Sequence, residues 1–76
     1  PLSGRFSGRL QRLDVEGGPW VLHAADGTTY HLVGDLGAAH RLLGRPVRVH
    51  GRLAPDVVTS AQVGPVVEVS SVEPDD

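Results

Sequence analysis

The sequence predicts an all-β domain in which five strands form a Greek-key barrel, with one short helix between the third and fourth strands. Ten glycines, six prolines and many valines in 76 residues favour short strands and tight turns over long helices. Residues 20–32 alternate apolar and polar side chains on both sides of Asp26-Gly27, a pattern typical of a β-hairpin. A chain of this length forms one domain with a thin core. We therefore assign residues 1–76 to a single domain and expect its tail, 73–76, to be disordered.

The first strand is expected over residues 5–10, where Phe6, Gly8 and Leu10 share one face of an extended chain. The apolar positions then change parity, from Leu10 to Leu13. A strand with a period of two accommodates such a change through a bulge or a sharp coil, which we place near Gln11-Arg12.

The hairpin has a predicted register. A three-residue connection at Ala25-Asp26-Gly27, with glycine in the left-handed position, sets Leu22 opposite Tyr30 and Trp20 opposite Leu32. These four large side chains are assigned to the core. The alternate positions then face outward, and they are Val21, His23, Thr29, His31 and Val33.

A helix is predicted over residues 35–44. Asp35 is a suitable N-cap, Gly44 a suitable left-handed C-terminal residue, and Pro46 prevents continuation. The side chains expected to cover the end of the barrel are Leu36, Ala39 and Leu43.

Two further strands complete the prediction, at 46–53 and 63–72. They are joined by a loop at 54–62 that contains a candidate short strand at 57–59. Val47, Val49, Leu53, Val67 and Val69 would face inward. Three strands, a helix and two strands, in this order, are the arrangement of the OB-fold, a partly open five-stranded barrel.

Several segments carry a resemblance to a known family. They are residues 17–22, the turn at Asp26-Gly27, residues 30–32, residues 44–51 and residues 63–66. Together they resemble a family of small uncharacterised bacterial OB-fold proteins over nearly the whole chain. The resemblance implies the OB-fold. Its motifs are core aromatics and turn glycines, so it brings no catalytic or binding residue with it.

Charge is unevenly distributed along the chain. Residues 5–52 hold seven arginines against four acids, whereas residues 56–76 hold five acids and no base. The net charge of −2 argues against a partner recognised mainly through phosphates. No apolar run reaches the roughly 18 residues of a membrane span. The sequence does not determine the cellular compartment. We favour the cytoplasm, and export after removal of a signal peptide is the alternative.

The function indicated is a non-catalytic binding or interaction module whose partner is a protein, either another chain or a second copy. The contact face would be the outward side of the hairpin, composed of Val21, His23, Thr29, His31 and Val33. The sequence has no cysteine, no phosphate-binding glycine loop and no nucleophile elbow, and so small a core offers no cleft for acid–base catalysis. We therefore expect no enzymatic activity and no cofactor.

Single-stranded nucleic-acid binding is the alternative. The residues that would contact phosphates lie outward on the first and fourth strands, which pair in an OB-fold: Arg5, Arg9, Arg48, His50 and Arg52. The competing interpretation pairs these arginines with the acidic C-terminal strand. The two loops that line the usual OB-fold binding face carry acids and no base, which disfavours nucleic acid there.

A metal-responsive module is the third possibility. His23 and His31 would be diagonal neighbours on the outer face of the hairpin, and imidazole suits zinc, nickel and copper. The spacing supplies no third ligand, since His50 lies on another strand. We accordingly assign no metal ligands.

Overall fold

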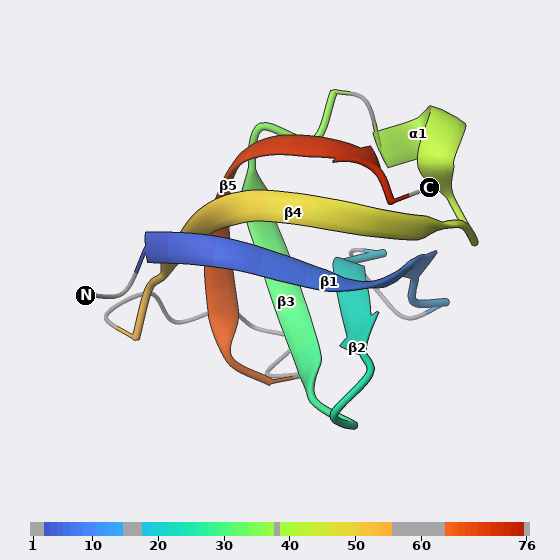
Figure 1. Cartoon of the computed structure of the whole chain (residues 1–76). Coiled ribbons are helices and arrows are strands. Elements are labelled where there is room, and N and C mark those ends of the chain that lie inside the picture. Colours follow the sequence, from blue (N-terminus) through green and yellow to red (C-terminus); the bar gives the residue numbers. More distant parts are fainter. Residues whose placement is uncertain (1–2, 15–17, 38, 56–63, 76) are drawn as a thin grey trace.

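The computed structural model describes residues 3–14, 18–37, 39–55 and 64–75 of the chain. Five strands and one short helix account for most of them (Figure 1). The elements are β1 (Ser3–Arg12), β2 (Trp20–Ala24), β3 (Thr29–Gly34), α1 (Ala39–Leu42), β4 (Pro46–Leu53) and β5 (Val66–Pro74).

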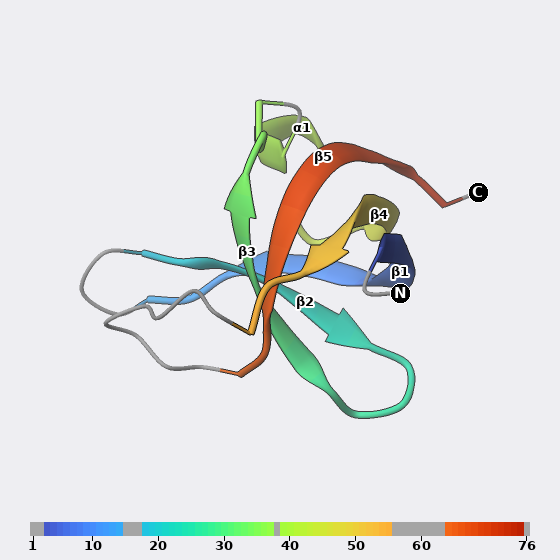
Figure 2. The ribbon, with the colours of Figure 1, turned by 90° about the vertical axis from the view of Figure 1, so that its left-hand side faces the viewer.

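The five strands form one sheet that closes on itself in a ring (Figures 1 and 2). Strand β1 pairs antiparallel with β2 on one side and with β4 on the other. Strand β3 pairs antiparallel with β2 and parallel with β5, and β5 pairs antiparallel with β4. The order around the ring is β1-β2-β3-β5-β4. The described residues confirm the prediction of five strands in one closed sheet with a short helix.

The core fills the ring with the side chains that the alternation predicted. Leu10, Leu22, Val47 and Val49 are fully buried, and Val67 joins them from β5. At one end Ala39 and Leu42 of α1 complete the same cluster, so the helix covers that end of the ring (Figure 2).

The hairpin has the predicted register. Leu22 lies opposite Tyr30 and Trp20 opposite Leu32. In the turn, Gly27 adopts a φ of 90° and its amide donates to the carbonyl oxygen of Ala24 at 3.1 Å. Glycine reaches this left-handed conformation without steric cost, which explains its place in the turn.

The bulge predicted for the first strand is not found there. Strand β1 pairs without a register shift with β4 from Ser3 to Arg9 and with β2 from Gly8 to Arg12. The register shifts instead between β4 and β5, where His50 lies opposite Ser71 but Gly51 lies opposite Val69. Ser70 is therefore the extra residue. This shift explains how Val69 and Val72, three positions apart, both pack toward the core.

The helix is much shorter than predicted. In place of a helix over 35–44, α1 spans Ala39–Leu42. The carboxylate of Asp35 accepts from the amide of Gly37 at 3.3 Å, and the amide of Ala39 donates to the carbonyl oxygen of Leu36 at 3.0 Å. These bonds form turns before the helix. The predicted left-handed residue at Gly44 is confirmed, with a φ of 78°.

The predicted inward face of the helix also needs correction. Leu42, not Leu43, enters the core: Leu42 is 7% exposed and Leu43 is 50% exposed. A long helix places the fourth residue after Ala39 on the same face. Here the tight turns space the inward residues by three positions, at Leu36, Ala39 and Leu42, as in a 3₁₀ arrangement.

Of the tail expected to be disordered, the structure describes residues 73–75, and Asp76 lies outside the described residues. Glu73 and Pro74 belong to β5, and the amide of Asp75 donates to the carbonyl oxygen of Pro46 at 3.1 Å. Strand β5 spans Val66–Pro74, and the predicted strand start at Val63 and the candidate strand at 57–59 lie outside the described residues. None of the described helical residues forms a helix long and apolar enough to cross a membrane.

Candidate functional site

The predicted contact face of the hairpin is largely covered. Val21 is fully buried and His31 is 7% exposed, so the outward exposure expected for these two residues is wrong. His31 lies between Val21 of β2 and Val66 of β5, both of them buried. Alternation along a strand predicts which side chains share a face, but it does not predict whether that face is covered. Of the remaining predicted residues, His23 is exposed, whereas Thr29 and Val33 are half-buried.

The two hairpin histidines differ in their surroundings. His23 Nδ1 lies 3.2 Å from the hydroxyl of Thr29, its partner across the hairpin. His31 is one of the buried residues of β3. In the described part of the chain, no group of three or more histidine, cysteine or acidic side chains could hold a metal ion.

The predicted arginine face is assembled by the pairing of β1 with β4. Arg5 lies opposite His50, and Ser7 lies opposite Arg48. The side chain of Arg9 points to the end of this face, where Nη1 donates to the carbonyl oxygen of Gly44 at 2.6 Å.

Acids of β5 and of the C-terminal residues occupy the β4 part of this face. Arg48 contacts Glu73 at 3.5 Å and Asp75 at 3.0 Å, and Arg52 contacts Glu68 at 3.5 Å. His50 Nε2 lies 2.9 Å from Glu73 Oε1. This hydrogen bond from His50 is the largest cause that lowers the pKa of Glu73, and the charges of His50 and Arg48 add to it. These contacts confirm the competing interpretation for Arg48, His50 and Arg52, which pair with acids of β5 and its end, but not for Arg5 and Arg9, which form no ion pair in the described ranges.

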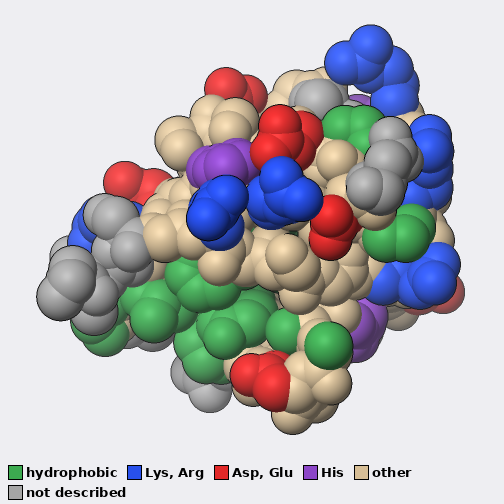
Figure 3. Space-filling view, viewed as in Figure 1, with side chains coloured by type: hydrophobic (Ala, Val, Ile, Leu, Met, Phe, Trp, Pro, Cys, Tyr) green, Lys and Arg blue, Asp and Glu red, His purple; other side chains and the backbone are tan. Residues whose placement is uncertain are grey.

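An apolar hollow lies at the end of the ring opposite α1, where β4 ends and β5 begins (Figure 1). It has a volume of about 290 Å³ and is lined by Leu53, Ala54, Pro55, Pro65 and Val66. Hydrophobic side chains gather in the same part of the surface in Figure 3, at the lower left. Sequence reasoning missed this hollow. The one available signal was the pair of prolines, Pro55 and Pro65, at the two ends of a loop.

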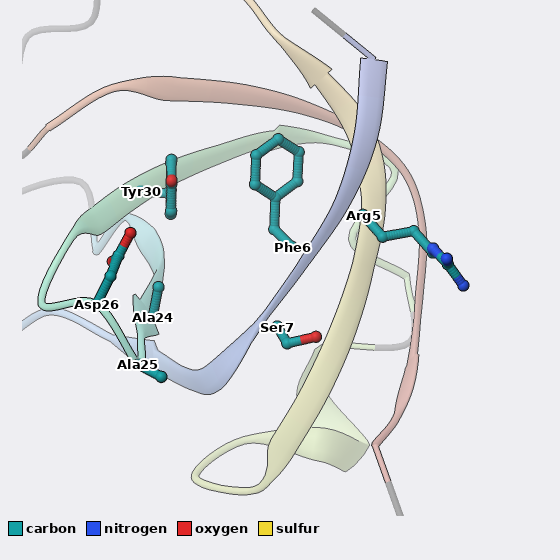
Figure 4. A pocket seen from close by; sticks show the side chains of 7 residues that line it. All are labelled: Arg5, Phe6, Ser7, Ala24, Ala25, Asp26 and Tyr30. Atoms are coloured by element: carbon teal, nitrogen blue, oxygen red, sulfur yellow. The ribbon is translucent and has the colours of Figure 1, made fainter.

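A second hollow, of about 270 Å³, lies between the start of β1 and the hairpin (Figure 4). The rings of Phe6 and Tyr30 stand beside each other there, with centroids 5.1 Å apart and planes tilted by 57°. Both side chains are half-buried. Arg5 belongs to the same wall, but its side chain is directed away from the aromatic pair (Figure 4).

The tip of the hairpin supplies the acid of this second hollow. A carboxylate oxygen of Asp26 accepts from the amide of Thr28 at 2.9 Å. This backbone hydrogen bond is the largest cause that lowers the pKa of Asp26, so the carboxylate carries its negative charge at neutral pH. The rim of the Phe6–Tyr30 hollow is therefore anionic beside Asp26 (Figure 4).

Fold and surface together define a small, β-rich domain whose ring-shaped sheet presents shallow hollows at one end and arginines along β1 and β4. The chain belongs to a family of proteins of unknown function, DUF5818, which matches residues 7–75. This confirms the predicted resemblance to an uncharacterised domain family. No curated protein and no solved structure matches the chain.

Proposed function

We propose that this chain is a non-catalytic binding module with the OB-fold, and that its partner is a protein. The order β1-β2-β3-β5-β4, with a helix between β3 and β4, supports the OB-fold. The exposed acids with a lowered pKa, Asp26 and Glu73, are both engaged by local hydrogen bonds. Neither is a desolvated group of the kind that general acid–base catalysis requires.

The observation that carries the proposal is the apolar hollow at the end of β4. The five lining residues that the structure describes are all apolar, so a partner gains there by burying an apolar side chain, at about 25 cal/mol per Å² of apolar area removed from water. A nucleic-acid backbone would gain nothing from these described residues, because none of them is a cation. We therefore move the contact face from the outer side of the hairpin to the end of the ring opposite α1, which we call the apolar end.

The second hollow extends the apolar end. The amide of His31 donates to the carbonyl oxygen of Pro65 at 2.8 Å, so Tyr30 and Pro65 lie on adjacent chain segments, and each lines one hollow. Half-buried aromatic side chains such as Phe6 and Tyr30 are enriched at the centres of protein interfaces. The carboxylate of Asp26 at the rim favours a partner that carries lysine or arginine beside its apolar side chain.

The experiment immobilises the domain in three forms, the wild type and two variants, and compares which proteins each form retains. Pro55→Glu places a charge in the apolar hollow at an exposed position. Pro74→Glu is the matched control, because Pro74 is also exposed but lines a surface beside Arg41 and Leu42 of α1. Amide spectra of both variants establish that the fold is intact, and sedimentation of the free domain tests whether the partner is a second copy.

The proposal expects proteins that the wild type and Pro74→Glu retain and that Pro55→Glu loses. Concentration-dependent dimerisation that Pro55→Glu abolishes would support it equally, with the domain as its own partner. Equal retention by all three forms would overturn it. A monomer that retains no protein in any form would also overturn it.

A further inference from the structure

Ion pairing divides the seven arginines into two groups. Arg48 and Arg52 pair with acids of β5 and its end. The other arginines form no ion pair with an acid in the described ranges: Arg5, Arg9, Arg12, Arg41 and Arg45. Apart from Arg5, they all belong to the end of β1, to α1 and to the turn after it. The acidic C-terminal strand thus neutralises β4 and leaves a separate group of cations near the helix.

Backbone contacts hold this group of cations together. The amide of Leu10 donates to the carbonyl oxygen of Arg45 at 3.1 Å, and the amide of Gly44 donates to that of Leu10 at 2.7 Å. The turn after α1 therefore runs beside the end of β1, and Arg9 closes onto it through its bond to Gly44. In Figure 3, basic side chains run along the edge of the molecule on which α1 lies.

The single tryptophan of the chain lies among these cations. Trp20 opens β2 directly opposite Arg12, whose guanidinium lies 5.5 Å from the centroid of the indole ring. The ring of His40, on α1, meets the indole edge-on at 5.2 Å. Trp20 is half-buried and packs against the edge of the core, so the residue is not fully enclosed. An aromatic ring bordered by guanidinium groups is the combination with which proteins bind single strands.

We propose that this surface, formed by Arg9, Arg12, Trp20, His40, Arg41 and Arg45, binds single-stranded nucleic acid. The guanidinium groups contact the phosphates, and a base stacks on the indole of Trp20 or on the plane of Arg12. The surface is at the α1 end, opposite the apolar end, so it is independent of the proposed protein partner. Of the arginines expected from the sequence alone to contact nucleic acid, it retains Arg9.

Nearby acids set the strength of this binding. Asp14 follows the end of β1 by two residues and Asp35 precedes α1 by four, and Asp35 accepts from the amide of Gly37. Glu73 lines a shallow surface together with Arg41 and Arg45, although its hydrogen bonds go to Arg48 and His50. Its negative charge repels a phosphate that approaches Arg41. Removal of that charge should therefore strengthen binding.

The test is a titration of the domain with a single-stranded oligonucleotide of about 12 nucleotides, followed by the fluorescence of Trp20. Because the chain has one tryptophan, quenching reports on this surface alone. Four phosphate contacts predict a slope of log K against log salt of about −3, equivalent to about a 50-fold loss of affinity between 50 and 200 mM salt.

Matched variants assign the contacts. Arg41→Gln and Arg45→Gln should each reduce the slope by about 0.7, the contribution of one phosphate contact. Arg5→Gln removes the same charge from an exposed position near the other end of β1 and should leave the slope unchanged. Glu73→Gln should raise the affinity, whereas Pro55→Glu, at the apolar end, should not alter it.

Three results would overturn the proposal. The first is absence of quenching in 50 mM salt. The second is an equal loss of affinity with Arg5→Gln, since that would show attraction by overall charge. The third is equal binding of inorganic polyphosphate with the same quenching, because polyphosphate has no base to stack.

Discussion

The hydroxyl of Ser70 donates to the carbonyl oxygen of His50 at 3.0 Å, at the point where the pairing of β4 with β5 shifts by one residue. The next residue, Gly51, lies where β5 approaches β4 too closely for a side chain. A Cβ on Gly51 would collide with the carbonyl oxygen of Glu68 and lie 3.1 Å from a methyl group of Val67. The two strands approach each other so closely only because Gly51 has no side chain.

Gly51→Ala should therefore lower the free energy of unfolding by about 1–3 kcal/mol, the usual cost of an added methyl group in a packed site. Gly4→Ala is the control, since a Cβ there meets nothing within 4 Å. Urea unfolding measures both. Equal stability of the two variants would contradict the role assigned to the bulge.

Adjacent leucines test which side of α1 faces the core. Leu42→Ala should cost about 2–4 kcal/mol, because the side chain is 7% exposed and its removal leaves a cavity beneath the helix. Leu43→Ala, at a side chain that is 50% exposed, should change stability by about 0.5 kcal/mol or less. Thermal or urea unfolding distinguishes them. A larger loss for Leu43→Ala would restore the helix face predicted from the sequence.

The ion pairs of Glu73 predict that the stability of the fold depends on pH. Its pKa in the folded protein is below the ordinary value of 4.5, so the ionised carboxylate favours the folded state. This contribution is complete above pH 4.5 and is lost as the pH falls through the lower folded pKa. The free energy of unfolding of the wild type should fall between about pH 6 and about pH 3, and Glu73→Gln should make this fall smaller.

The cause of that shift is tested separately, by carbon NMR titration of the Glu73 carboxyl group. The hydrogen bond from His50 is the largest cause and Arg48 a smaller one. His50→Ala should therefore raise the pKa of Glu73 toward its ordinary value by more than Arg48→Gln does. The reverse order would assign the shift to the Arg48 ion pair.

The hairpin turn depends on an acceptor at position 26. Asp26→Ala removes the hydrogen bond to the amide of Thr28, so hydrogen exchange of that amide should become faster and the unfolding midpoint should fall. Asp26→Asn keeps an acceptor oxygen in the same place and should preserve most of the protection. If alanine and asparagine protected the Thr28 amide equally, the turn would not depend on this bond.

Much of the fold followed from local patterns. The Asp26-Gly27 turn predicted the register of Leu22 with Tyr30, and the alternation predicted the inward side chains of β4, because both signals depend on neighbours along the chain. The bulge was predicted on the wrong strand. A change of parity shows that a register shift exists somewhere, but Leu10-to-Leu13 and Val69-to-Val72 give the same signal, and only the pairing of β4 with β5 distinguishes them.

The candidate sites followed less well. The outer face of Val21 and His31 is buried, and the apolar end combines residues from β4, β5 and the segments beside them. The separation of the arginines depends on contacts between Arg48 and residues 25 and 27 positions later in the chain. No pattern within one strand contains that information.

The sequence by itself determined a small closed β-sheet, the hairpin register and the left-handed conformations of Gly27 and Gly44, because backbone sterics and period-two alternation act between near neighbours. Only the tertiary structure decided which faces are covered and which arginines remain without an acid partner among the described residues. Burial and ion pairing are decided between strands that are distant in sequence, since closure of the ring places the acidic end of β5 against β4 and leaves Trp20 beside Arg12 and His40.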